Sequence, residues 1–111
     1  MLKAKLIITA SVFFALSAFA AYEIETQGTT VIIKKDGIVV QTVQQSQNQE
    51  YLKTITSLIN NIKEVEATTR ETVAELRESG MDEMAAQTEA DAQVEIKMFE
   101  KTIEVEIKLL K

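Results

Sequence analysis

The sequence has no cysteine, histidine, proline or tryptophan, and glycine occurs only three times in 111 residues. Without histidine and cysteine, the chain lacks the most common general base, the thiolate nucleophile and the usual zinc and copper ligands. It also lacks a glycine-rich loop of the kind that binds phosphate. These absences predict a protein that is not an enzyme and that has no catalytic residues, no metal site and no cofactor.

The lack of cysteine also restricts how the fold can be stabilised. Small exported domains often depend on disulfides, so here the burial of apolar side chains or self-association must supply the stability. A cysteine-free exported protein of this size fits a bacterial envelope better than a eukaryotic secretory pathway.

The first 20 residues have the features of a signal peptide. Lys3 and Lys5 form a short basic start, residues 6–19 are uncharged and mostly apolar, and residues 18–20 (AFA) have the small-x-small pattern of a cleavage site. We therefore expect cleavage after Ala20 and a periplasmic or secreted mature domain of residues 21–111. The alternative is an uncleaved membrane anchor, although its apolar run, residues 6–21, is shorter than the roughly 20 residues that span a bilayer.

Acidic residues dominate the rest of the chain. All 17 acidic residues follow residue 20 but only 10 of the 12 basic ones do, which leaves the mature chain with a net charge of −7. Nucleic acids and anionic lipid surfaces are bound through lysine and arginine. The sequence therefore predicts no nucleic-acid partner, and contact with a membrane only transiently, through the signal peptide.

Residues 21–43 are expected to form a β-hairpin or meander. Tyr22, Ile24 and Thr26 alternate with Glu23 and Glu25, which is a short half-buried strand pattern. Two runs rich in β-branched residues then flank Asp36-Gly37, which is typical of a type I′ hairpin turn. The register around this turn pairs Lys35 with Ile38, Ile33 with Val40, and Val31 with Thr42. That register places Val31, Ile33, Ile38 and Val40 on one face, and Ile32, Val39 and Val43 on the other.

Residues 46–79 are expected to form one long amphipathic helix. Ser46 and Gln49 have the spacing of a capping box, and apolar residues then recur at alternating spacings of three and four. A helix of about 30 residues extends roughly 45 Å, so its apolar side needs a partner along much of its length. The candidate packing or interaction residues of this seam are Tyr51, Ile55, Leu58, Ile59, Ile62, Val65 and Leu76.

Gly80 is expected to end this helix, and residues 82–99 to form a second helix that packs back on it. Residues 102–110 fit two patterns. As a strand, apolar residues alternate with charged ones and could complete a small sheet with the hairpin. As a helix, the segment extends the stripe of Ile96, Ile103 and Ile107 but leaves a second apolar set exposed: Val94, Met98, Val105 and Leu109. We choose the strand.

The predicted fold class is α+β, and the alternative is a β-hairpin followed by an αα-hairpin coiled coil. The expected function is that of an exported interaction or structural module, which contacts a protein partner or a second copy through the long helix. One alternative is a small acidic periplasmic protein that binds a ligand or cation through Glu71, Glu75, Glu78 and Asp82. Another is a membrane-anchored envelope protein.

Overall fold

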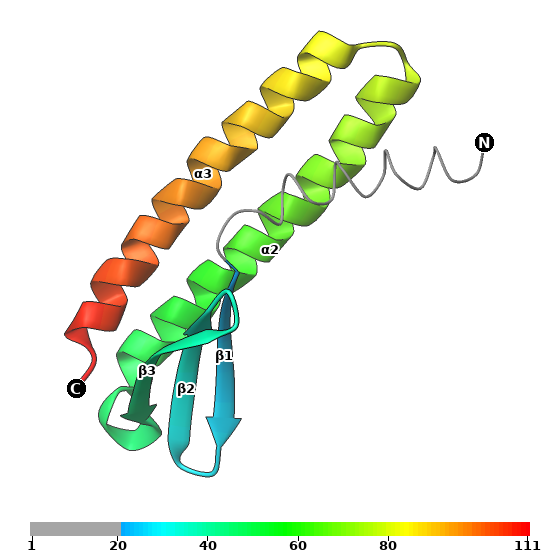
Figure 1. The fold of residues 1–111 in the computed structure, drawn as a ribbon. Helices are drawn as coiled ribbons and strands as arrows, with labels where there is room; N and C mark the ends of the chain where they lie inside the picture. Colours follow the sequence, from blue (N-terminus) through cyan, green and yellow to red (C-terminus); the bar gives the residue numbers. More distant parts are fainter. Residues whose placement is uncertain (1–20) are drawn as a thin grey trace.

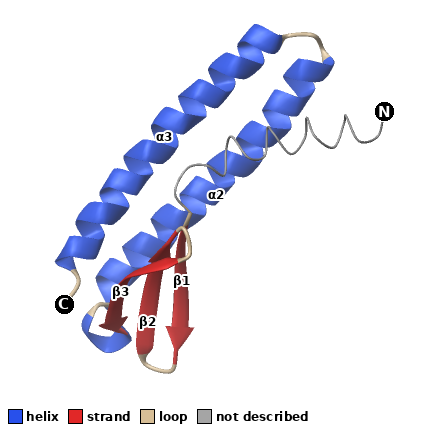
Figure 2. Ribbon diagram, viewed as in Figure 1, coloured by secondary structure: helices blue, strands red, loops and turns tan. Residues whose placement is uncertain are grey.

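The computed structural model describes residues 21–111 as three strands followed by two long helices (Figures 1 and 2). The elements are β1 (Tyr22–Gln27), β2 (Thr30–Lys35), β3 (Ile38–Gln44), a short 3-10 helix η1 (Gln45–Gln47), α2 (Gln49–Glu78) and α3 (Asp82–Leu109). The strands form an antiparallel sheet in the order β1-β2-β3. This arrangement confirms the predicted α+β class. The predicted signal peptide, residues 1–20, lies outside the described residues.

The predicted hairpin turn is confirmed. Asp36 and Gly37 connect β2 to β3 with φ angles of 54° and 79°, and a type I′ turn requires positive φ at both central residues. Lys35 pairs with Ile38 on either side of the turn, as the sequence predicts.

The register farther from the turn differs from the prediction because β3 contains a bulge. The pairing shifts between Ile33 and Lys34, so Ile33 pairs with Gln41 instead of Val40, and Val31 pairs with Val43. One extra residue in a strand reverses the face of every side chain beyond it. Val43 therefore joins Val31 and Ile33 in the core, whereas Val40 is exposed.

The long helix begins later than predicted, and the capping box is wrong. Residues 45–47 form η1, α2 starts at Gln49, and no side chain caps its first turn. Buried Asn48 occupies this junction instead: its Nδ2 donates to the carbonyl of Gln44 at 2.9 Å, and its Oδ1 accepts from the backbone N–H of Lys111 at 2.7 Å. These bonds fix both the start of α2 and the end of the chain.

The predicted stop at Gly80 is confirmed. Gly80 has φ of 77°, and the N–H groups of Gly80 and Met81 donate to the carbonyls of Arg77 and Leu76. This is the hydrogen-bond pattern of a Schellman motif, which satisfies two of the free carbonyls at a helix end. The chain then reverses, and α3 runs antiparallel beside α2 (Figure 1).

The strand prediction for residues 102–110 is wrong. These residues continue α3, which ends at Leu109, and the third strand of the sheet is β1. No turn residue interrupts residues 99–102, and the helix buries Ile103 on the same side as Ile96. The helical alternative that the sequence allowed is therefore the observed one.

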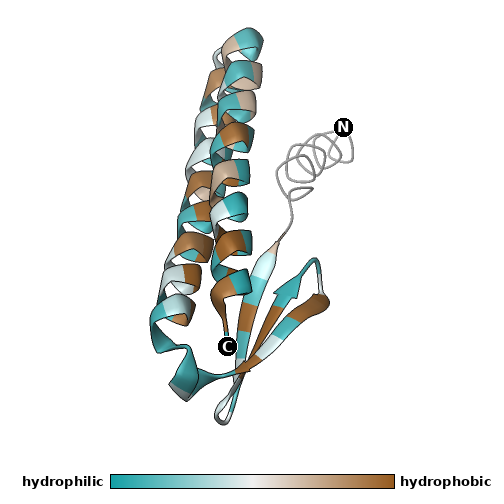
Figure 3. Ribbon diagram, turned by 90° about the vertical axis from the view of Figure 1, so that its left-hand side faces the viewer, coloured by the Kyte–Doolittle hydropathy of each residue, from teal (hydrophilic) through white to brown (hydrophobic). Residues whose placement is uncertain are grey.

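One face of the sheet packs against the end of the helix pair where α2 begins and α3 ends (Figures 1 and 3). The core contains Tyr22, Val31, Ile33 and Val43 from the sheet, Leu52, Ile55, Ile59 and Ile62 from α2, and Ile96 and Ile103 from α3. Beyond the sheet, the two helices bury smaller residues against each other: Thr69, Val73, Ala85 and Ala92. Small side chains let the helices pack closely where no third layer covers them.

Candidate functional site

The seam of α2 is covered by the chain itself. Ile55, Ile59 and Ile62 are buried in the core, and Leu58 and Val65 are half-buried against it. Tyr51 and Leu76 are half-buried at the two ends of the seam. The structure thus brings the seven predicted residues onto one face, but that face packs against α3 and the sheet. A partner could reach only its edges.

A second apolar stripe runs along the opposite side of α3. Val94, Met98, Val105 and Leu109 are exposed, by 62% for Val94 and 64% for Met98. Val94 and Met98 each lie two residues from fully buried Ile96, and two residues correspond to about 200° around a helix. These four residues, which we call the outer stripe, therefore point away from the core. The helical alternative in the sequence identified all four.

The tip of the β2–β3 hairpin forms a further exposed apolar patch. Ile38, Val39 and Val40 are exposed, Ile38 by 69%. Ile38 and Val39 pair with Lys35 and Lys34 beside the turn, and Val40 is the extra residue of the bulge, without a partner in β2. The regular register predicted from the sequence placed Val40 on the same face as Val31 and Ile33, because it gives no sign of the extra residue.

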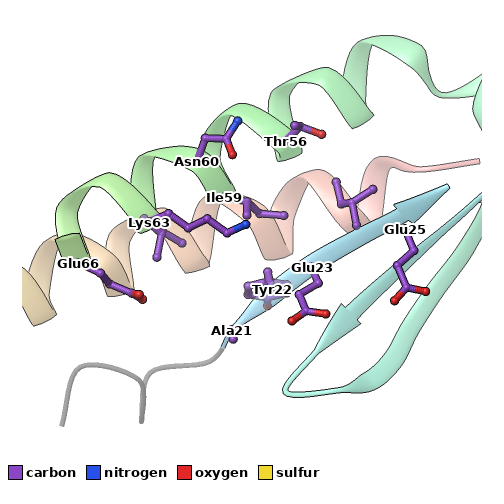
Figure 4. A pocket seen from close by; sticks show the side chains of 11 residues that line it. Ala21, Tyr22, Glu23, Glu25, Thr56, Ile59, Asn60, Lys63 and Glu66 are labelled. Atoms are coloured by element: carbon purple, nitrogen blue, oxygen red, sulfur yellow. The ribbon is translucent and has the colours of Figure 1, made fainter. Parts of the chain in front are cut away.

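A groove runs along the free edge of β1, between that strand and α2. Its main part has a volume of about 470 Å³. It is lined by Ala21, by the first four residues of β1, and by residues of α2 that include Ile59, Asn60, Lys63 and Glu66 (Figure 4). A second hollow of about 310 Å³ continues toward Thr26 and Leu52, and both parts share Ile24 and Thr56. We call the two parts together the edge groove. The sequence did not predict it, because it depends on which strand lies at the edge.

A cluster of charged side chains lies where β2 meets α3. The ammonium of Lys35 lies 3.5 Å from a carboxylate oxygen of Glu104 and 5.5 Å from the centre of the Tyr22 ring. Burial raises the pKa of the Tyr22 hydroxyl, and the nearby Tyr22 hydroxyl raises the pKa of Lys35. Glu100 is buried beside this cluster, and its desolvation raises the pKa of its carboxyl group against the attraction of Lys35.

The acidic row of Glu71, Glu75, Glu78 and Asp82 lies across the connection between α2 and α3. Within residues 21–111, no three acidic, histidine or cysteine side chains converge closely enough to hold a metal ion. The row spans the end of α2 and the start of α3 on the surface, so its carboxylates face water. Over the same residues, neither helix has the length and apolarity needed to cross a membrane.

Comparisons with protein families, with curated proteins and with solved structures give no match to this chain.

Proposed function

We propose that this protein is an exported, non-enzymatic structural or interaction module of a bacterial envelope, and that it associates with a second copy through the outer stripe of α3. The observation that carries the proposal is the exposure of Val94, Met98, Val105 and Leu109 on one side of a helix whose other side is already packed. Apolar side chains at helical spacing on a solvent-facing side are typical of a helix that packs against another helix.

The charges beside the outer stripe favour parallel pairing of two copies of α3. At 100° per residue, Lys101 and Lys108 lie along one edge of the stripe, and Glu95 and Glu106 lie along the other. In a parallel pair, each edge faces the opposite edge of the partner helix, so lysines meet glutamates. In an antiparallel pair, like edges face each other and the charges repel.

The spacing of the outer stripe also suits a long, nearly straight contact. Val94 and Met98 are followed after 11 residues by Val105 and Leu109. An 11-residue repeat corresponds to about 3.67 residues per turn, close to the 3.6 of a straight helix. The contact would extend for about 22 Å, at 1.5 Å per residue over residues 94–109.

The absence of cysteine gives this proposal a direct test by disulfide crosslinking. In a parallel pair, Leu109→Cys in one copy lies opposite the same residue in the other, so the oxidised protein should run as a covalent dimer. In an antiparallel pair, position 109 would lie opposite position 94, and only a mixture of Leu109→Cys and Val94→Cys proteins would crosslink. Ser57→Cys on the exposed side of α2 is the control. A monomer by light scattering at high concentration, with no more crosslinking of Leu109→Cys than of the control, would refute self-association.

Export is tested separately by mass spectrometry of the protein expressed in a bacterial host. A mature N-terminus at Ala21, in protein released from the periplasm, is the expected result. An intact N-terminus in the membrane fraction would support the anchored alternative instead.

A further inference from the structure

We infer that the edge groove is a binding site for an extended segment of a partner protein, which adds to the sheet as a fourth strand beside β1. The expected segment alternates apolar side chains, which enter the groove, with basic side chains, which lie over the outer face of the sheet. This site is separate from the outer stripe of α3, and its test does not depend on self-association.

The backbone of β1 has unpaired hydrogen-bonding groups along the groove. β1 pairs only with β2, and the N–H of Asp36 donates to the carbonyl of Ala21 at 3.0 Å. In an antiparallel ladder the backbone groups of successive residues point alternately to the two sides of the strand. Since the backbone groups of Ala21 point toward β2, those of Tyr22, Ile24 and Thr26 point to the opposite side, which is the free edge. No other element bonds to them in the described part of the chain.

The groove follows this edge along nearly the whole strand. Its lining begins at Ala21 and continues to Thr26, and it includes both inward residues such as Ile24 and outward ones such as Glu23. A hollow that reaches both faces of a strand lies at its edge. Six residues of extended chain span about 20 Å, so a segment of that length would match β1. Figure 4 shows α2 forming the opposite wall.

The walls of the groove specify the inward side chains of the segment. Tyr22 and Ile24 on β1 face Ile59 and Ile62 on α2, and Leu52 lies at the far end. An added strand would direct every second side chain toward these residues. Aliphatic side chains at those positions would gain burial, as in other cases in which an extended peptide extends a sheet.

The charges on the outer face of β1 specify the remaining side chains of the segment. They also disfavour β1 of a second copy as the added strand. Glu23 and Glu25 project from the outer face of β1. Lys34 of β2 lies opposite Glu23 in the register, but in the described chain its ammonium forms an ion pair with Glu25, at 3.0 Å. Directly opposed side chains on neighbouring strands interact, so lysine or arginine in the added strand would pair with Glu23. Two copies of β1 joined edge to edge would instead oppose glutamates, which is a common way to prevent such pairing.

The test measures fluorescence anisotropy of a labelled, capped hexapeptide, Val-Lys-Val-Lys-Val-Lys, titrated with the full protein at physiological ionic strength. Binding of this peptide, and weaker binding of the matched Val-Glu peptide, are expected. Glu23→Lys changes an exposed side chain and should reverse this preference between the two peptides. Equal binding of both peptides by both proteins, or no binding of the lysine peptide, would overturn the proposal.

A proline variant tests the backbone contacts. Thr26→Pro removes an N–H group that points to the free edge, and edge strands tolerate proline at such positions. Binding should weaken about fivefold, as for the loss of one hydrogen bond, while Thr26→Val should bind like the unchanged protein. Circular dichroism establishes that both variants are folded, and the Glu23→Lys result decides the proposal if the proline variant is not. Binding by folded Thr26→Pro as tight as that of the unchanged protein would also overturn it.

Discussion

α2 and α3 have nearly the same length, 30 and 28 residues, but they distribute their apolar side chains differently. α2 has a single seam, and within the described chain it exposes no large hydrophobic residue. α3 has two stripes on opposite sides, one buried in the core and one facing solvent. A helix with one apolar stripe buries that stripe when it packs against its neighbour. A helix with two stripes still has an exposed apolar side, which can contact another molecule.

The largest expected effect comes from one substitution in each stripe of α3. Ile103 is fully buried, so Ile103→Ala should lower the free energy of unfolding by about 2–5 kcal/mol, through lost burial and the cavity that remains. Val105→Ala, two residues away in the outer stripe, should change it by no more than about 0.5 kcal/mol. Urea unfolding followed by circular dichroism at low protein concentration, where self-association contributes least, measures both. Similar losses of stability in both variants would contradict the assignment of one stripe to the core and the other to the solvent-facing side.

A smaller effect is expected at the connection between the two helices. Gly80 has φ of 77° and nothing within 4 Å of an added Cβ, so Gly80→Ala introduces backbone strain without a clash. The free energy of unfolding should fall by about 1 kcal/mol. Gly80→Asn should cost less, because asparagine adopts the left-handed conformation more readily than alanine. Thermal unfolding of the two variants side by side measures the difference, and equal stability of all three proteins would contradict the assigned strain.

The two stripes of α3 also explain which parts of the fold the sequence could predict. Local chemistry was sufficient for the Asp36-Gly37 turn, the seam of α2 and the stop at Gly80. Residues 102–110 were misassigned because a helix with two opposite stripes has apolar residues at i and i+2, about 200° apart, which is also the pattern of a strand. Only packing distinguishes the two, because β1 already provides the third strand.

The remaining errors also depend on contacts between distant segments. The bulge in β3 becomes necessary only when Val43 must reach a core made with α2 and α3. Asn48 replaces the expected capping box because its side chain binds the backbone of Lys111, which is 63 residues away. The edge groove arises from the order of the strands in the sheet, and no local pattern in the sequence encodes that order.

The smallest expected effect concerns a carboxylate at the boundary between the buried stripe of α3 and the sheet. Burial raises the pKa of Glu100, so the folded protein holds this proton more tightly than the unfolded chain does. Protonation of Glu100 therefore stabilises the fold at acidic pH, and that contribution is lost as the pH rises from the ordinary carboxyl range through the raised pKa. Glu100→Gln should accordingly unfold at a higher urea concentration than the unchanged protein at neutral pH, with the difference shrinking as the pH falls.

Glu104→Gln is the matched control on the same helix. Its carboxylate is half-exposed and lies 3.5 Å from Lys35, so its replacement should lower stability slightly at neutral pH, by under about 1 kcal/mol. Opposite signs for the two variants would show that desolvation dominates at Glu100, whereas attraction dominates at Glu104. If Glu100→Gln also lowered stability at neutral pH, the attraction of Lys35 would outweigh the burial of Glu100. The inner side of α3 would then depend on charge as well as on its isoleucines.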